Sequence, residues 1–185
     1  MAKQRNGQNR RIDVLRRFAS DCSGVTAIEF GLLALPFFAV IGAILETSAM
    51  FISGQVLETA LQETSRLVRT GQTQTGFSLD TFRADMCSRT YGLFGDCSGV
   101  FIDVRPVVAG FSSAALSPPV DVTCTTSCTW TRAQQFDDGG QNSVMMAEAY
   151  FRWQPIVGLD LGFNNLGDGR RLLGSATVFQ NEPFG

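Results

Sequence analysis

The sequence contains no histidine. That absence removes Ser-His-Asp and Cys-His catalysis and most zinc hydrolases from consideration. A P-loop, a dinucleotide-binding glycine pattern and a nucleophile elbow are missing as well. Asp137 and Asp138 are paired carboxylates, but they stand in a glycine turn, where solvation accounts for them. We therefore expect no enzyme, no cofactor and no metal site.

Basic residues are scarce outside the first 24 positions. Removing residues 1–24 takes away six of the 15 basic and two of the 17 acidic residues, which leaves a net charge of −6. Nucleic-acid binding needs clustered Lys and Arg to meet the phosphates, so an acidic body argues against it. The basic leader directly precedes an apolar run, and we interpret it as a topology signal rather than a nucleic-acid-binding arm.

That apolar run extends from Phe30 to Ile52. It holds no charged residue between Phe30 and Leu45, and beyond Glu46 it stays mostly apolar. A helix crosses a bilayer with about 20 apolar residues, so the run is long enough if Glu46 lies near the far interface. The positive-inside bias then keeps the leader in the cytoplasm and places the rest of the chain across the membrane. The basic residues of the leader are Lys3, Arg5, Arg10, Arg11, Arg16 and Arg17.

The junction of leader and apolar run carries a recognisable motif, Ser23-Gly24-Val25-Thr26-Ala27-Ile28-Glu29-Phe30. A basic leader, a glycine, a carboxylate five residues later and a long apolar helix together resemble a type IV prepilin processing site. The continuation to Pro36 is similar to the TadE/TadF-like minor pilins, or pseudopilins, of tight-adherence (Tad/Flp, type IVc) pili. Residues 176–184 also resemble the end of some TadE-like proteins.

The resemblance implies a minor pilin that is cleaved between Gly24 and Val25 and takes part in assembly of a tight-adherence pilus, where it would prime, cap or dock the filament. Glu29 would be the fifth mature residue and would pair with the free amine of a neighbouring subunit's Val25, which sets the subunit register. The alternative is that the Glu29 side chain merely extends to the membrane interface at the start of an uncleaved anchor. The implied partners are a prepilin peptidase, the major pilin, other minor pilins, the inner-membrane assembly platform and membrane lipid.

Two other classes of protein remain open. One is an uncleaved single-pass inner-membrane anchor that presents a periplasmic binding module. The other is a secreted protein, because Thr47-Ser48-Ala49 is a passable signal-peptidase site before Met50. The secreted alternative is weakened by its unusually long n-region and by the amphipathic helix that continues beyond Ser53.

The cysteine count is odd, but Cys22 lies in the leader. Cleavage after Gly24 would leave four cysteines on the oxidising side of the membrane, the even number that a disulfide framework needs. Local spacing favours Cys87–Cys97 and Cys124–Cys128 among the three possible pairings. Four zinc-bound thiolates are the less favoured alternative, because their spacing is not that of a zinc knuckle.

The hydrophobic period predicts an α+β protein: a long N-terminal transmembrane and amphipathic helix packed on a small antiparallel sheet, as in pilins. We expect this helix from about Val25 to Thr70 with Gly71 as its stop, and a second helix from Ser78 to Tyr91. The predicted domains are a cleaved cytoplasmic leader (1–24), the long helix (25–71) and a periplasmic head (72–185). The expected strands begin near Val100 and comprise residues 100–105, 120–124, 128–132, 144–154 and 172–180.

The loop between Pro155 and Arg171 is rich in glycine. Asp160, Asn164, Asn165 and Asp168 could be read as a calcium loop, but their spacing departs from the EF-hand pattern. We favour a surface loop whose apolar residues cover the head or face another subunit. Those residues are Ile156, Val157, Leu159, Leu161 and Phe163.

Overall fold

The computed structural model describes residues 24–73, 76–156 and 162–184. The chain divides between Gly42 and Ala43 into two compact units, each of which is described by itself. Residues 1–23 of the predicted leader, including Cys22, lie outside the described residues, as do Val157, Leu159, Asp160 and Leu161.

Helix α2 comprises Val25–Arg69, one residue shorter than predicted, and continues through Pro36. Two of its hydroxyl side chains near the unit boundary are satisfied within the helix. The hydroxyl of Thr47 donates to the carbonyl of Ala43 at 2.8 Å, and that of Ser48 donates to Ile44 at 2.7 Å. Such back-bonding lets hydroxyl side chains sit in an apolar helix without leaving a donor unsatisfied.

The end of α2 is a Schellman motif. The backbone N–H of Gln72 donates to the carbonyl of Leu67 at 3.0 Å, and that of Gly71 donates to Val68 at 3.1 Å. Gly71 has a φ of 74°, and a Cβ there would overlap the ring of Phe184. The predicted stop at Gly71 is therefore required both by backbone conformation and by a close approach.

Helix α3 comprises Leu79–Ser88, and its N-cap Ser78 accepts a hydrogen bond from the Thr81 amide, as expected. The helix ends three residues before the predicted Tyr91. Beyond Ser88 the chain turns back, and Tyr91 takes a φ of 53°, which no helix continues through.

The sheet has the strand order β2-β1-β3-β4, with β1 at Val100–Pro106, β2 at Gln135–Phe136, β3 at Val144–Trp153 and β4 at Arg171–Gln180. The three long strands are antiparallel, with Val104 opposite Ala147 and Ala147 opposite Thr177. The short β2 pairs parallel with β1, so the sheet is mixed rather than wholly antiparallel. The α+β class is confirmed.

The strands predicted at 120–124 and 128–132 are wrong; this region contains only an isolated bridge between Val120 and Trp130. Around Asp121 the backbone donors are satisfied locally instead. The Asp121 carboxylate accepts from the amide of Thr123 at 2.8 Å, and the Cys124 amide donates to the Asp121 carbonyl at 3.2 Å. Short polar side chains that bond their own backbone favour turns over a strand ladder.

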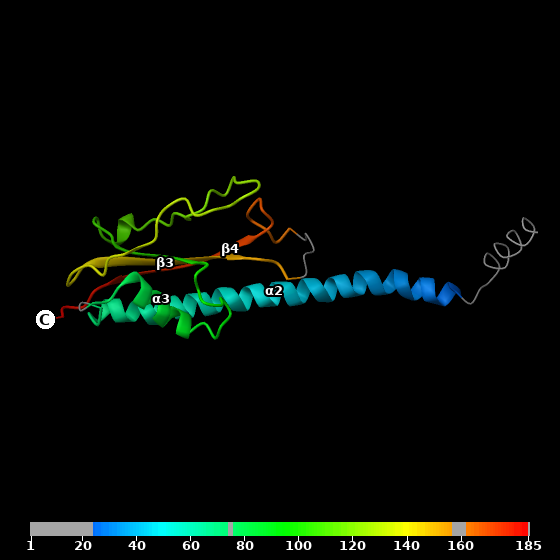
Figure 1. Cartoon of the computed structure of the whole chain (residues 1–185), viewed down its shortest axis with the longest axis horizontal. Helices are drawn as coiled ribbons and strands as arrows, with labels where there is room; N and C mark the ends of the chain where they lie inside the picture. The colour runs from blue at the N-terminus through cyan, green and yellow to red at the C-terminus, as the bar shows by residue number, and fades with distance from the viewer. Residues whose placement is uncertain (1–23, 74–75, 157–161, 185) are drawn as a thin grey trace, which may run out of the picture. The chain divides into compact units, whose positions relative to one another are not determined.

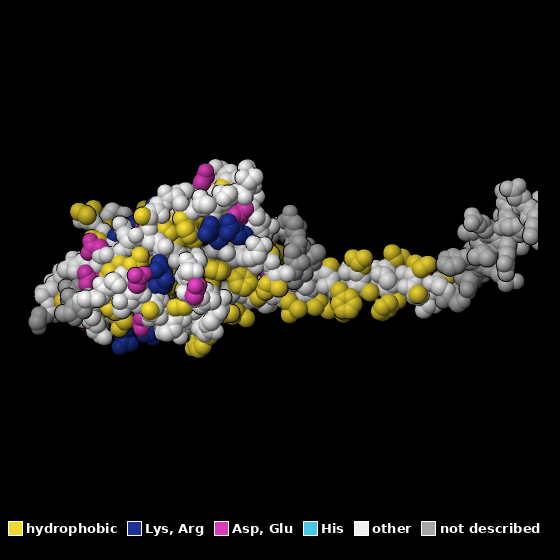
Figure 2. All heavy atoms as spheres, viewed as in Figure 1, with side chains coloured by type: hydrophobic (Ala, Val, Ile, Leu, Met, Phe, Trp, Pro, Cys, Tyr) yellow, Lys and Arg dark blue, Asp and Glu magenta, His cyan; other side chains and the backbone are white. Residues whose placement is uncertain are grey.

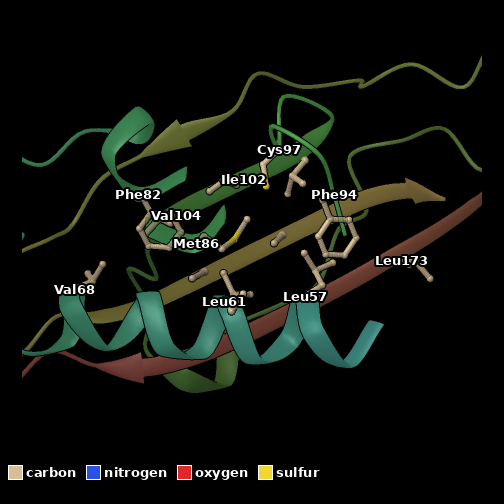
Figure 3. Close-up of a cluster of buried hydrophobic side chains, with 14 of the residues drawn as sticks. Leu57, Leu61, Val68, Phe82, Met86, Phe94, Cys97, Ile102, Val104 and Leu173 are labelled. Carbon is tan, nitrogen blue, oxygen red and sulfur yellow. The ribbon is translucent and has the colours of Figure 1, made fainter. Parts of the chain in front are cut away.

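The main core lies between the sheet and the part of α2 that belongs to residues 43–185 (Figure 1). Figure 3 shows Leu57, Leu61 and Val68 of α2 facing side chains of α3 and the sheet. The predicted core face of β3 is confirmed, because Met145, Ala147 and Ala149 are buried in this cluster and Phe151 and Trp153 pack against it. The other sheet-side members include Ile102, Val104 and Leu173.

Candidate functional site

Almost all large apolar side chains of α2 between Val25 and Gly42 are exposed (Figure 2). Phe30, Leu33 and Leu35 each expose more than two thirds of their surface, and the most apolar window of α2 has no buried residue. By length and composition α2 is able to cross a membrane, and its position near the N-terminus also fits a signal sequence. An apolar helical segment that the described residues leave exposed fits a single-pass membrane anchor.

Gly24 directly precedes α2, and Val25 is the first residue of the helix. No atom lies within 4 Å of the Cβ position of Gly24, and its φ is not in the left-handed region. Nothing in the described part of the chain therefore demands a glycine here. Glu29 lies one turn into the helix and is exposed, so its carboxylate is available to a partner.

Glu46 is buried to 7% exposure, although the sequence placed it at a membrane interface. Its carboxylate accepts from the indole N–H of Trp153 at 3.1 Å and from the backbone N–H of Ile156 at 2.7 Å. Both donors come from the end of β3 and the residues that follow it. Glu46 thus connects α2 to the end of β3, and it does so from a position within the apolar run.

The four cysteines outside the leader form two pairs at disulfide distance. Cys87 and Cys97 have Cα atoms 5.9 Å apart, and Cys124 and Cys128 have Cα atoms 5.4 Å apart. The first pair joins the end of α3 to the turn before β1. These are the pairs that local spacing favours.

The second cysteine pair lies against an ionic cluster. Asp168 accepts from the amide of Cys128 at 3.1 Å and from the Nε of Arg170 at 3.0 Å. The hydrogen bond from Arg170 is the main reason that the pKa of Asp168 falls to about 2. Arg152 also donates to the Cys128 carbonyl at 2.6 Å and lies over the ring of Trp130.

The calcium alternative finds little support in this arrangement. Asp168 is engaged by Arg170, and the side-chain oxygen of Asn165 accepts from the backbone N–H of Leu172 at 2.7 Å. Within residues 24–73, 76–156 and 162–184, no group of three or more acidic, Cys or His side chains is placed to hold a metal ion. Asp160 lies outside the described residues.

Charged residues are buried on the sheet face that looks away from α2. Glu148 and Asp103 stand opposite each other in the register of β1 and β3, and both are essentially without exposure. Arg132 lies 2.6 Å from Glu148 and 3.0 Å from Asp103, while Arg105 lies 3.4 Å from Glu148. Burial, with the neighbouring Glu148, raises the pKa of Tyr150 to about 12. This network holds the segment between β1 and β2 against the sheet.

Residues 24–66 match the model of a family described as TadE-like protein. This segment is TadE-like. The match confirms the resemblance carried by residues 23–36; it covers most of α2 and includes neither α3 nor the sheet. No curated protein and no solved structure matches the chain.

The TadE-like segment contains Gly24, Val25, Glu29 and Glu46, whereas the four paired cysteines lie outside it. The structure therefore separates the predicted site residues into two groups. Gly24, Val25 and Glu29 lie at the beginning of α2, and the four cysteines lie in the α+β head. Sequence reasoning missed the role of Glu46; the available signal was a lone carboxylate at the end of an uncharged run.

Proposed function

We propose that this chain is a minor pilin, or pseudopilin, required for assembly of a tight-adherence pilus. In this proposal a prepilin peptidase cuts between Gly24 and Val25 on the cytoplasmic side of the inner membrane. The mature chain keeps one transmembrane helix and a periplasmic head, and it primes, caps or docks the filament. Its partners are the major pilin, other minor pilins and the inner-membrane assembly platform.

The observation that carries the proposal is the TadE-like match, which begins at Gly24 and includes Glu29. Two structural facts support it. Gly24 has no packing or conformational reason of its own to be glycine, which leaves recognition by a peptidase as a reason for its presence. The apolar surface of α2 between Val25 and Gly42 is exposed within the described chain, as a segment that enters lipid or a helical bundle requires.

Glu29 has the sharpest role in this proposal. A carboxylate inside a membrane helix is costly unless it is paired, and such residues are by default functional. The amine released on Val25 by the peptidase is a suitable partner when it belongs to a neighbouring subunit. Pairing of the two charges in a medium of low dielectric constant would neutralise both and fix the axial register of adjacent helices.

Glu29→Ala tests this role. We expect the variant to insert in the membrane and to be cleaved like the native chain, but to support no pilus assembly. Glu58→Ala is the matched control, because Glu58 is an exposed glutamate of the same helix whose side chain accepts a hydrogen bond from Gln62 in the next turn. The readouts are the amount of membrane-bound protein and the number of pili per cell.

Normal piliation with Glu29→Ala would contradict the registration role. Loss of piliation in both variants would point to general damage to α2 instead. An uncleaved anchor that presents a periplasmic binding module predicts that Glu29→Ala and Glu58→Ala behave alike.

A further inference from the structure

A groove of about 500 Å³ runs beside α2, entirely within residues 43–185. Phe51, Ile52 and Val56 of α2 line it with apolar side chains, and Tyr91 from the turn after α3 lines it as well. Phe51 and Ile52 each expose more than half of their surface. Charged side chains of Glu63 and Arg89 also line the groove.

Tyr91 is exposed to solvent, but the turn that carries it is held in place by contacts. Its side chain is 89% exposed, and its φ of 53° is an unfavourable backbone conformation for an aromatic residue. The turn that carries it is firmly held: Thr90 donates to the Cys87 carbonyl at 2.8 Å, and the ring of Phe94 packs on Phe151 with centroids 4.7 Å apart. Contacts within the described chain therefore do not explain why an exposed aromatic residue occupies this position.

The groove adjoins the end of the apolar run. Phe51 and Ile52 are the last residues of the run that begins at Phe30, and 23 helical residues extend about 34 Å, close to the hydrocarbon thickness of a bilayer. When this run crosses the membrane, Phe51 and Ile52 lie at the interface on the side of the head. Tyr91 lines the same groove as Phe51 and Ile52.

Two further features suit a position at the membrane interface. Tyrosine is enriched at membrane interfaces, because its ring is apolar and its hydroxyl is polar. Glu46 precedes Ile52 by less than two turns, and a bare carboxylate there would be costly near hydrocarbon. It is buried and receives hydrogen bonds from Trp153 and Ile156, so it is shielded from such surroundings.

We propose that this groove is a membrane-contact surface of the head, occupied by phospholipid of the leaflet on that side. Acyl chains pack against Phe51, Ile52 and Val56, while the hydroxyl of Tyr91 and the charged rim formed by Glu63 and Arg89 face the headgroups. The contact fixes the height of the head above the bilayer. The proposal rests on membrane insertion of α2 and goes beyond anchorage by the helix alone.

The test uses the full chain reconstituted in phosphatidylcholine vesicles that carry bromine either near the headgroup end or near the methyl end of the acyl chains. Tyr91→Trp probes the groove. Val108→Trp is the control, because Val108 is 100% exposed and follows Pro106, which pairs with Met145 at the opposite end of β3 from Trp153. Emission of each variant is compared with that of the native chain, which contains two tryptophans.

Phe38→Trp reports on insertion separately, because Phe38 is exposed in the middle of the apolar run. We expect its added emission to be lost with bromine near the methyl end, and that of Tyr91→Trp to be blue-shifted and lost with bromine near the headgroup end. The added emission of Val108→Trp should remain red and unquenched.

Quenching of Phe38→Trp without quenching of Tyr91→Trp would overturn the groove proposal and leave membrane anchorage intact. A blue shift of Tyr91→Trp without quenching would overturn it as well, because a protein segment, such as the apolar helix of a second copy, would then occupy the groove. Absence of quenching in Phe38→Trp would refute insertion itself and the groove proposal with it. The pilus-assembly experiment with Glu29→Ala is independent of the first two outcomes.

Discussion

Replacement of Glu46 by alanine should destabilise the head, although Glu46 lies within the apolar run of α2. The carboxylate accepts two hydrogen bonds, one from the Trp153 indole at 3.1 Å and one from the Ile156 amide at 2.7 Å. The substitution removes both and detaches α2 from the end of β3. The indole N–H of Trp153 and the backbone N–H of Ile156 then need water as a hydrogen-bond acceptor.

The expected loss follows from the number and surroundings of these bonds. Removal of a hydrogen bond to a charged group costs about 1.5–3 kcal/mol when the donor stays buried. The side chain of Ile156 is well exposed and Trp153 is only partly buried, so water can reach both donors after the substitution. We therefore expect a total of about 2–3 kcal/mol for Glu46→Ala, and roughly half of that for Glu46→Gln, which keeps one acceptor oxygen.

The assay is urea unfolding of the full chain in detergent micelles, followed by tryptophan emission. Trp153 serves as a local probe, since its emission should shift in Glu46→Ala before any urea is added. Glu58→Ala is the control and should change the free energy of unfolding by less than about 0.5 kcal/mol, because Glu58 is exposed. Equal stabilities of the Glu46 and Glu58 variants would refute the reasoning.

Three further predictions concern the head. The pKa of Asp168 is lowered to about 2, so its contribution to stability is fully present above the ordinary value of 3.8 and is lost as the pH falls through about 2. The difference in unfolding free energy between the native chain and Asp168→Asn should shrink over that range. Arg132→Met should cost about 3 kcal/mol in urea unfolding, because it removes a partner from the buried carboxylate of Glu148. Gly71→Ala should lower the stability by more than about 1 kcal/mol, because its φ is positive and the Phe184 ring occupies the space of a Cβ.

Each of these predictions has a matched comparison. A pH-independent difference for Asp168→Asn would contradict the lowered pKa. Arg69→Met removes an exposed pair with Glu182 and should cost less than about 1 kcal/mol; an equal loss for Arg132→Met would mean that the buried network adds little. Gly76→Ala shares the φ of 74° but meets no atom within 4 Å, so Gly71→Ala should be the more harmful of the two.

Local patterns in the sequence predicted much of the fold. Apolar residues at helical spacing placed α2 to within one residue at its end, and a capping serine placed the start of α3. Period-two alternation found the three long strands. The family resemblance followed from a compact motif at Gly24, Val25 and Glu29, which the TadE-like match supports.

What the sequence did not predict depends on contacts between distant segments. Strand β2 has two residues and no period of its own; it forms because Phe136 packs against Phe77 and Phe82 while its backbone meets β1. The role of Glu46 requires donors more than 100 positions away, as the 107-residue separation from Trp153 shows. The polar turn at Asp121 failed as a strand for the opposite reason, since local hydrogen bonds prevailed over the ladder.

The central claim is that the mature chain begins at Val25. Its most direct test is the intact mass of the protein purified from its native membrane, measured before and after reduction. We predict a chain that starts at Val25 and gains two hydrogens for each of two disulfides on reduction. A full-length chain that retains Cys22 would contradict the claim and leave an uncleaved anchor, and a chain that starts at Met50 would instead make this a secreted protein.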